Sequence, residues 1–72
     1  MAKIIGRGVL KSYSQDIVLT TAIRARDFPG LLKITKELAE VTIMVRDHQK
    51  LDDDEFINDE DEIYLFMAVM GG

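Results

Sequence analysis

Cysteine is absent from this sequence, and histidine occurs once, at His48. A disulfide framework and a thiolate metal site both require cysteine, and His48 has no second histidine with which to share a metal ion. A domain of 72 residues buries only about 60% of the surface that its unfolded chain exposes, so folds of this size often depend on a disulfide or a metal. We therefore expect one domain, residues 1–72, that binds no metal and is held by its hydrophobic core alone.

Basic residues and long apolar runs are scarce as well. Nine Lys and Arg stand against 13 Asp and Glu, a formal net charge of -4. Nucleic-acid binding needs clustered Lys and Arg to displace counterions, so this balance argues against nucleic acid and favours a basic protein partner. Gly6, Arg7 and Gly8 interrupt the apolar N-terminus, and no run approaches the length of a membrane span. We expect no membrane partner and a cytoplasmic location.

The apolar pattern predicts an α+β domain. Runs typical of strands occur at residues 3–10, 17–23, 41–45 and 62–69. The first two should pair as a hairpin, with Gly6 and Gly8 as irregularities of the first strand. One helix is expected at about residues 28–39, where apolar residues recur at roughly helical spacing, and this order of elements predicts a mixed sheet packed on one helix.

Local signals support the helix and the C-terminal half. Asp27 can cap the free amides, Pro29 suits the first turn, and Phe28 can pack beneath the helix. After a turn at residues 46–50, a short strand or loop is expected near Leu51. The acidic segment 52–62 should then cross the surface with its one apolar pair, Phe56 and Ile57, turned inward.

Both faces of the last strand are apolar. Ile63, Leu65, Met67 and Val69 alternate with Tyr64, Phe66 and Ala68. Because one helix covers only one face of a sheet, Tyr64 and Phe66 are candidates for an exposed apolar patch. The alternative is that they cover neighbouring strands as ordinary sheet-surface aromatics.

Gly71 and Gly72 follow this strand at the end of the sequence. Such an end is often no more than a frayed terminus. Gly-Gly is also the narrowest and most adaptable peptide, because glycine lacks a Cβ. Residues 69–72, fully extended, would reach roughly 13–14 Å from the domain. A flexible tail of this kind is suited to thread a tunnel and to insert a carboxylate into the active site of another protein.

The segment "DEDEIYLFMAVMGG" resembles the C-terminal signature of the MoaD and ThiS sulfur carriers, in which an acid-Gly-acid turn leads to an apolar strand and a terminal Gly-Gly. Upstream, "VTIMVRDHQKLDDDEFI" is similar to their third strand, turn and loop, and "DFPGLLKITKEL" stands where their helix would be. The resemblance covers most of residues 28–72 and little of residues 1–27. Two departures place side chains where glycine is usual: Glu60 stands inside the acid turn, and Asp47 and His48 replace an Asn-Gly pair.

The resemblance implies a ubiquitin-like β-grasp, a mixed sheet of four to five strands packed on one main helix. It also implies a protein co-substrate and not an enzyme. A separate adenylating enzyme would use ATP to activate the terminal carboxylate, which is converted to a thiocarboxylate and delivers sulfur to an acceptor synthase subunit. The chain itself would bind no cofactor.

The resemblance further assigns roles to seven residues. Gly72 would supply the reacting carboxylate, and Gly71 would leave room for it in the active site of the partner. Ala68, Val69 and Met70 would form the segment that threads into the partner enzyme. Tyr64 and Phe66 would help to dock that enzyme. MoaD tails usually carry a proline pair that "FMAVMGG" lacks, which favours ThiS-like sulfur supply for thiamin thiazole over a MoaD-like role in molybdopterin synthesis. A ubiquitin-like protein modifier, or a carrier for tRNA thiolation, stays open.

Three other motifs suggest different functions. "ARDFPGLLKITKELAEV" resembles the Asp-x-Pro-Gly turn and helix of amino-acid-binding ACT domains, but that fold needs a second long helix, which residues 46–61 are too acidic and aperiodic to form.

"GRGVLKS" has the spacing of neither a phosphate loop nor a dinucleotide fingerprint, so ATP would be bound by the partner. "LDDDEFINDEDE" lacks the central glycine of a calcium loop and reads as a solvated acidic loop that steers a basic partner.

Overall fold

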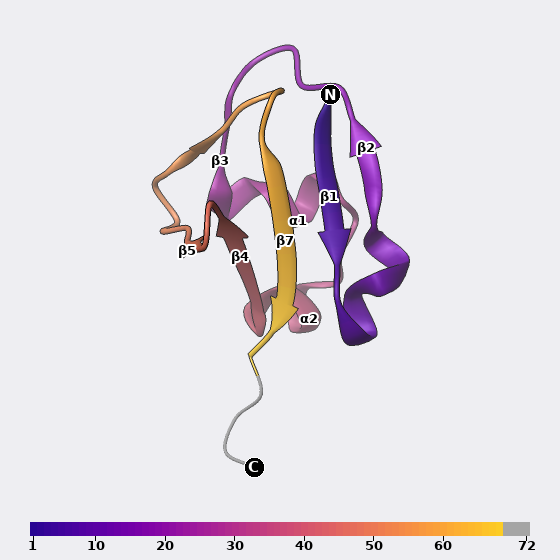
Figure 1. Cartoon of the computed structure of the whole chain (residues 1–72). Coiled ribbons are helices and arrows are strands. Elements are labelled where there is room, and N and C mark those ends of the chain that lie inside the picture. Colours follow the sequence, from indigo (N-terminus) through magenta and orange to yellow (C-terminus); the bar gives the residue numbers. More distant parts are fainter. Residues whose placement is uncertain (69–72) are drawn as a thin grey trace.

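A five-stranded mixed sheet forms the centre of the computed structural model, in which residues 1–68 are described (Figure 1). Its strand order is β2-β1-β7-β4-β5. The bounds are Ala2–Gly6 for β1, Gln15–Ile17 for β2, Thr42–Arg46 for β4, Gln49–Lys50 for β5 and Glu62–Met67 for β7. A separate two-stranded sheet pairs β3 (Ile23–Arg24) with β6 (Phe56–Ile57).

The two central strands, β1 and β7, run parallel, and every other pair of strands is antiparallel. The register aligns Ile4 with Ile63 and Gly6 with Leu65. On the other side of β7, Tyr64 lies opposite Val45 of β4. The predicted mixed sheet is therefore confirmed, with five strands.

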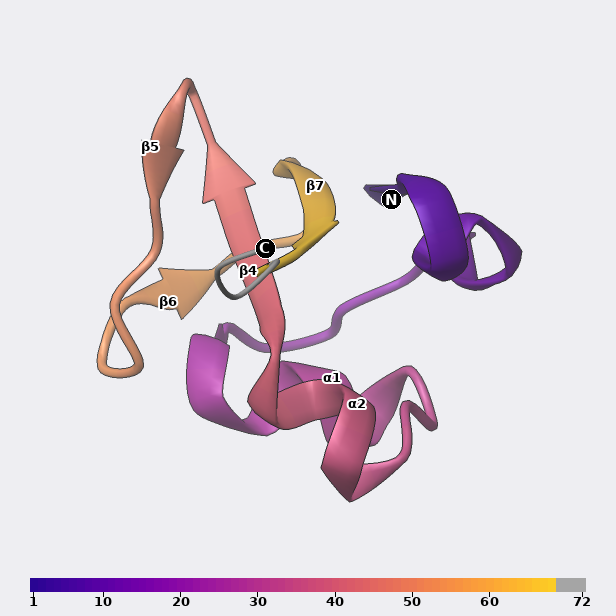
Figure 2. The same cartoon turned by 90° about the horizontal axis from the view of Figure 1, so that it is seen from below.

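Helical segments cover one face of this sheet. They are the 3-10 helix η2 (Ala25–Asp27) and the α-helices α1 (Phe28–Leu31) and α2 (Lys36–Glu40). A further 3-10 helix, η1 (Gly8–Tyr13), connects β1 to β2. Both α-helices lie behind the sheet in Figure 1 and to one side of β4 and β7 in Figure 2. None of the helices within residues 1–68 is long and apolar enough to cross a membrane.

The hydrophobic core fills the space between the sheet and the helical layer. Ile63 and Leu65 of β7 and Phe28 of α1 are 0% exposed. The other buried apolar residues are Ala2, Ile4, Leu10, Ala25, Leu32, Ile34, Met44, Leu51 and Ile57. Burial of a large apolar side chain contributes about 1.5–3 kcal/mol, so this cluster is the main source of stability in the described residues.

The predicted continuous helix over residues 28–39, the one main helix of the expected fold, is wrong. Lys33 has a φ of 62°, in the left-handed region where helices end. Thr35 then has an extended conformation and starts α2, because its Oγ1 accepts a hydrogen bond from the Leu38 N–H at 3.3 Å. Such a side-chain cap satisfies an amide that the first turn leaves free. Two short helices therefore replace one longer helix.

Of the three sequence predictions for the start of α1, two are confirmed and one is wrong. Pro29 lies in the first turn, and Phe28 packs beneath the helix as predicted. Asp27 forms no side-chain hydrogen bond to the helix start, so the predicted cap is wrong.

The predicted N-terminal hairpin is confirmed in its pairing but not in its bounds. β1 pairs with β2 from Ala2–Ile17 to Ile4–Gln15, but β1 ends at Gly6 and residues 9–10 belong to η1. Gly8 starts the change of direction with a φ of 59°, so it is not a strand irregularity. Residues 23–24 leave this hairpin and pair with β6 instead.

The C-terminal half follows the sequence more closely. A short strand, β5, precedes Leu51, and β7 covers residues 62–67 of the predicted strand, whose last residue lies outside the described part. Ile57 is 0% exposed as predicted, but Phe56 is 47% exposed. Neighbouring side chains of a strand point to opposite faces, so β6 cannot turn both inward.

Gly6 is required by the close packing of η1 against β1. A Cβ at this position would collide with the carbonyl oxygen of Leu10. The Gly6 N–H also donates to the Ser14 Oγ at 2.8 Å, which ties the C-terminal end of η1 to the end of β1. At Gly30 in α1, by contrast, a Cβ would meet nothing within 4 Å.

We expect Gly6→Ala to destabilise the fold by about 1–3 kcal/mol, because the backbone of η1 must shift to admit the new methyl group. Gly30→Ala is the matched control and should change stability by at most about 1 kcal/mol, on the stabilising side. Urea unfolding followed by circular dichroism measures both. Equal destabilisation by the two variants would contradict the packing described at Gly6.

Candidate protein-docking surface

The face of the sheet that turns away from the helices is apolar. Tyr64 and Phe66 of β7 lie on it, opposite Val45 and Ile43 of β4. Met44, between these two β4 residues, points into the core, as strand alternation requires. Tyr64, Val45 and Ile43 are half-buried, and the side chain of Phe66 is 39% exposed. Within residues 1–68, no α-helix lies over this surface (Figure 2).

The two aromatic residues stack on each other. Their ring centroids are 6.4 Å apart, with an angle of 18° between the ring planes. The Arg7 guanidinium carbon lies 5.6 Å from the centroid of the Tyr64 ring, within the range of a cation–π contact. The sequence hypothesis of an apolar patch at Tyr64 and Phe66 therefore agrees with where these side chains lie, although Tyr64 also packs on its neighbours.

A groove of about 630 Å³ runs over this surface. Three apolar residues and four polar or charged residues line it, namely Val45, Tyr64 and Phe66 together with Arg7, Asp47, His48 and Glu62. We call it the sheet groove. Its volume falls in the range of about 300–1,000 Å³ that is usual for binding sites.

Within the sheet groove, the Tyr64 hydroxyl donates a hydrogen bond to the Glu62 Oε1 at 2.8 Å. This bond and the negative charge of Glu62 raise the pKa of Tyr64 above its ordinary value. Both effects favour the protonated phenol, because a tyrosinate would face the carboxylate.

The polar rim of the sheet groove includes a strained turn. Arg46 pairs with Gln49, so Asp47 and His48 form a two-residue connection between β4 and β5. Their φ angles are 54° and 66°, as in the type I′ turn that joins antiparallel strands and usually contains Asn-Gly. Here two residues with side chains adopt it. From the sequence, His48 is expected only to be a turn residue, and no pattern assigns a role in binding to Arg7, Asp47 or Glu62.

The acid turn before β7 needs no glycine. Glu60 is not among the residues with positive φ, so replacing the usual glycine of this turn adds no backbone strain. Asp59 accepts a hydrogen bond from the Leu19 N–H at 2.7 Å and lies 3.3 Å from the N-terminal amine of Met1. The hydrogen bond, with the nearby amine, lowers the pKa of Asp59.

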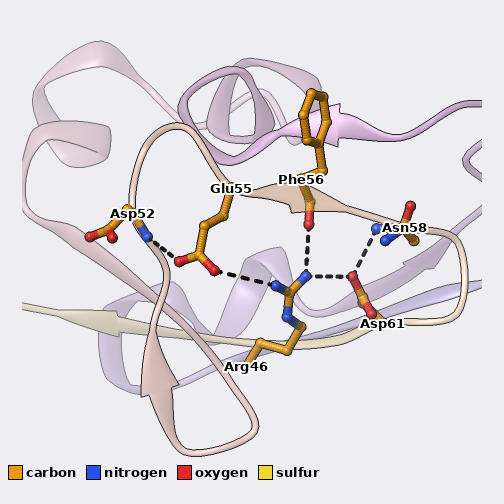
Figure 3. Close-up of polar contacts among 6 residues, drawn as sticks. All are labelled: Arg46, Asp52, Glu55, Phe56, Asn58 and Asp61. Carbon is orange, nitrogen blue, oxygen red and sulfur yellow. Dashed lines mark hydrogen bonds and ion pairs between the residues drawn. The ribbon is translucent and has the colours of Figure 1, made fainter.

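Arg46 holds the acidic segment against the sheet (Figure 3). Its Nη1 donates to the Phe56 carbonyl oxygen at 2.7 Å and to the Asp61 Oδ2 at 2.8 Å. Its Nη2 lies 3.6 Å from the Glu55 Oε1. Asp61 also accepts the Asn58 N–H at 2.8 Å. The side chains of Arg46 and Asp61 are 22% and 20% exposed, so this cluster positions the chain as it enters β7.

The described part of the chain ends at Ala68. This residue is half-buried, and its N–H donates to the Val41 carbonyl oxygen at 2.6 Å, which extends the pairing of β7 with β4. Four of the predicted site residues, Val69, Met70, Gly71 and Gly72, lie outside the described residues. Tyr64 and Phe66 alternate with Ile63 and Leu65 along β7 and share one face of the strand, and Ala68 follows directly after β7.

Comparison with known proteins adds no family assignment. No protein-family model matches the chain, and no curated protein matches it. The function is therefore argued from the sequence motifs and from the sheet groove.

We expect Arg46→Gln to destabilise the protein by about 1.5–3 kcal/mol, the range for hydrogen bonds to charged groups, because Asp61 loses its charged partner where water reaches it poorly. Arg26→Gln removes the same charge from an exposed pair, in which the Arg26 Nη1 lies 3.7 Å from the Asp54 Oδ1. It should cost at most about 1 kcal/mol. Urea unfolding of both variants tests this, and equal losses would mean that only overall charge matters.

The pKa of Tyr64 should fall toward its ordinary value of 10.0 in Glu62→Gln. In the unsubstituted protein, the raised pKa means that the contribution of Tyr64 to stability is complete below its unfolded pKa and is lost as the pH rises through its folded pKa. NMR titration of the Tyr64 ring measures the shift. Asp47→Asn is the control, since Asp47 does not bond the hydroxyl. An unchanged Tyr64 titration in Glu62→Gln would contradict the assignment.

Proposed function

We propose that this chain is a sulfur carrier protein of the MoaD and ThiS type. The carboxylate of Gly72 is adenylated by a partner enzyme and converted to a thiocarboxylate, which supplies sulfur for cofactor biosynthesis in the cytoplasm. The protein acts as a co-substrate. The partner enzyme binds ATP, and an acceptor synthase subunit receives the sulfur.

The observation that carries this proposal is the course of β7. This strand lies at the centre of the sheet, bears Tyr64 and Phe66 on the uncovered face, and leads through Ala68 to the last four residues. An enzyme that binds the sheet groove therefore lies beside the point from which the Gly-Gly segment continues. The proposed docking surface lies on β7, and the proposed reacting end follows this strand in the sequence, as a carrier requires.

The arrangement of the sheet supports a ubiquitin-like β-grasp. Its first and last strands lie side by side in the middle, antiparallel strands flank them, and helical segments pack on one face. The short helices leave the other face open to a partner. The absence of a glycine at position 60 does not weaken the resemblance, because the backbone there has no positive φ.

The chemistry requires a partner enzyme. A carboxylate is a poor electrophile, so one Gly72 oxygen first attacks the α-phosphorus of ATP and pyrophosphate leaves. Hydrosulfide, supplied by a sulfide donor, then attacks the acyl-adenylate carbon. The new C–S bond forms as the C–O bond to AMP breaks, AMP leaves with that electron pair, and loss of the S–H proton gives the thiocarboxylate of Gly72. The described residues of this chain need only present the tail and bind the enzyme.

The alternatives differ in support. ThiS-like sulfur supply for thiamin thiazole is favoured over MoaD-like molybdopterin synthesis by the lack of a proline pair in the tail. A ubiquitin-like modifier, or a carrier for tRNA thiolation, would use the same surface and the same carboxylate. An ACT-like amino-acid-binding module is less well supported, because residues 46–61 contain β5, β6 and turns but no α-helix, as their sequence predicts.

Incubation with extract of the source cells, ATP and a sulfide donor should replace one oxygen of the Gly72 carboxylate with sulfur. Intact mass spectrometry followed by peptide mapping detects the change and places it on Gly72. A variant lacking Gly72 is the control and should stay unmodified, since it lacks the reacting group.

Other outcomes of the same experiment separate the alternatives. Covalent conjugates of the chain on lysines of other proteins would support the modifier. An unmodified Gly72, together with a melting temperature that rises on addition of a free amino acid, would overturn the carrier and support the regulatory module.

A further inference from the structure

We infer that the sheet groove accepts a partner segment that carries an arginine or lysine, with the cation between Glu62 and Asp47 and an adjacent apolar side chain over Val45 and Phe66. Asp47 and His48 are then specificity-determining residues. The inference rests on the proposed function only in assigning this segment to the adenylating enzyme.

Strand register gives the sheet groove one acidic end. β4 and β7 are antiparallel and Val45 lies opposite Tyr64, so residues after Val45 lie near residues before Tyr64. Asp47 and Glu62 therefore line the same end of the groove. Arg7 follows Gly6, which pairs with Leu65 of β7, so its backbone lies toward the other end, level with Phe66.

No ion pair within the described part of the chain neutralises the charges at the acidic end. Among residues 1–68, neither Asp47 nor Glu62 forms an ion pair with a basic group. Glu62 accepts a hydrogen bond from the neutral Tyr64 hydroxyl. An incoming cation therefore meets two carboxylates without displacing an existing partner. Such rim charges select partners and speed association more than they add affinity.

The aromatic floor suits the same occupant. Arg7 already lies over one part of the Tyr64 ring, which shows that this surface accommodates a guanidinium. The Phe66 side chain is 39% exposed and offers apolar contact beside it. A segment with an apolar residue next to a cation would bury this contact and pair with the acidic end.

The turn at Asp47 and His48 is the second observation. An Asn-Gly pair adopts a type I′ turn with less strain, because glycine has no Cβ to collide with the backbone at positive φ. Here the strained conformation places two side chains in the wall of the sheet groove. Strained backbone conformations tend to occur at functional sites, so the strain at Asp47 and His48 is consistent with a role of their side chains in binding a partner.

The first test uses two dipeptides as probes. Acetyl-Leu-Arg-amide carries the inferred cation, and acetyl-Leu-citrulline-amide has nearly the same shape without charge. In an NMR titration, the arginine probe should shift the signals of Asp47, Glu62 and Tyr64 and bind about two- to fivefold more tightly than the citrulline probe, the ratio expected for exposed ion pairs. Equal affinities, shifts confined to other surfaces, or no binding would overturn the inference.

The second test restores the common turn sequence. The double variant Asp47→Asn/His48→Gly should melt at the same or a higher temperature, because the turn is relieved of strain, and yet lose the preference for the arginine probe. Asp16→Asn removes an equal charge from exposed strand β2, outside the groove, and should keep the preference. A double variant that still prefers the arginine probe as strongly as the unsubstituted protein would overturn the role of the turn.

The outcome for the groove and the outcome for the proposed function are separable. Thiocarboxylate formation on Gly72 without selective binding of the arginine probe would overturn the groove inference and leave the carrier function standing. Selective binding without any change at Gly72 would do the reverse. If both hold, the double variant should raise the KM of the adenylating enzyme for this protein and leave its kcat unchanged, because the groove lies outside the reacting group.

Discussion

The parallel pairing of β1 with β7 is the contact on which the rest of the structure depends. It joins residues from the two ends of the sequence, and it makes the last strand central instead of peripheral. Ile4, Ile63 and Leu65 can be buried only because these strands are neighbours. The same pairing brings Arg7 to the Tyr64 ring. The core and the sheet groove therefore lie on opposite faces of the sheet, and both depend on the pairing of β1 with β7.

Helices cover only one face of the sheet, and the candidate site lies on the other face. A chain of 72 residues has material for one helical layer, and the short helices of residues 25–40 lie on a single face. The other face keeps apolar residues on both β4 and β7. A contiguous exposed apolar surface rimmed by polar residues is typical of an interaction site. The acidic rim is the feature from which we infer a preference for a basic partner segment.

The sequence predicts those parts of the fold that depend on neighbouring residues better than those that depend on contacts between distant segments. The strands around residues 42–46 and 62–67 and the pairing of β1 with β2 follow from apolar periodicity and from short connections. The helix prediction fails at Lys33, where a positive φ divides residues 28–39 in two, because periodicity reports which residues are apolar and not whether the backbone between them is continuous. Phe56 is wrongly expected to be buried because its environment depends on the pairing of β6 with β3, which lie far apart in sequence.

The candidate site divides in the same way. Alternation along residues 62–67 is a local property, so the sequence alone determined that Tyr64 and Phe66 share a face opposite Ile63 and Leu65, and that the tail follows this strand. The tertiary structure alone decided which charges surround them. Arg7, Asp47 and Glu62 come from three separated segments, and they line one groove only because the sheet places β1 and β4 on either side of β7.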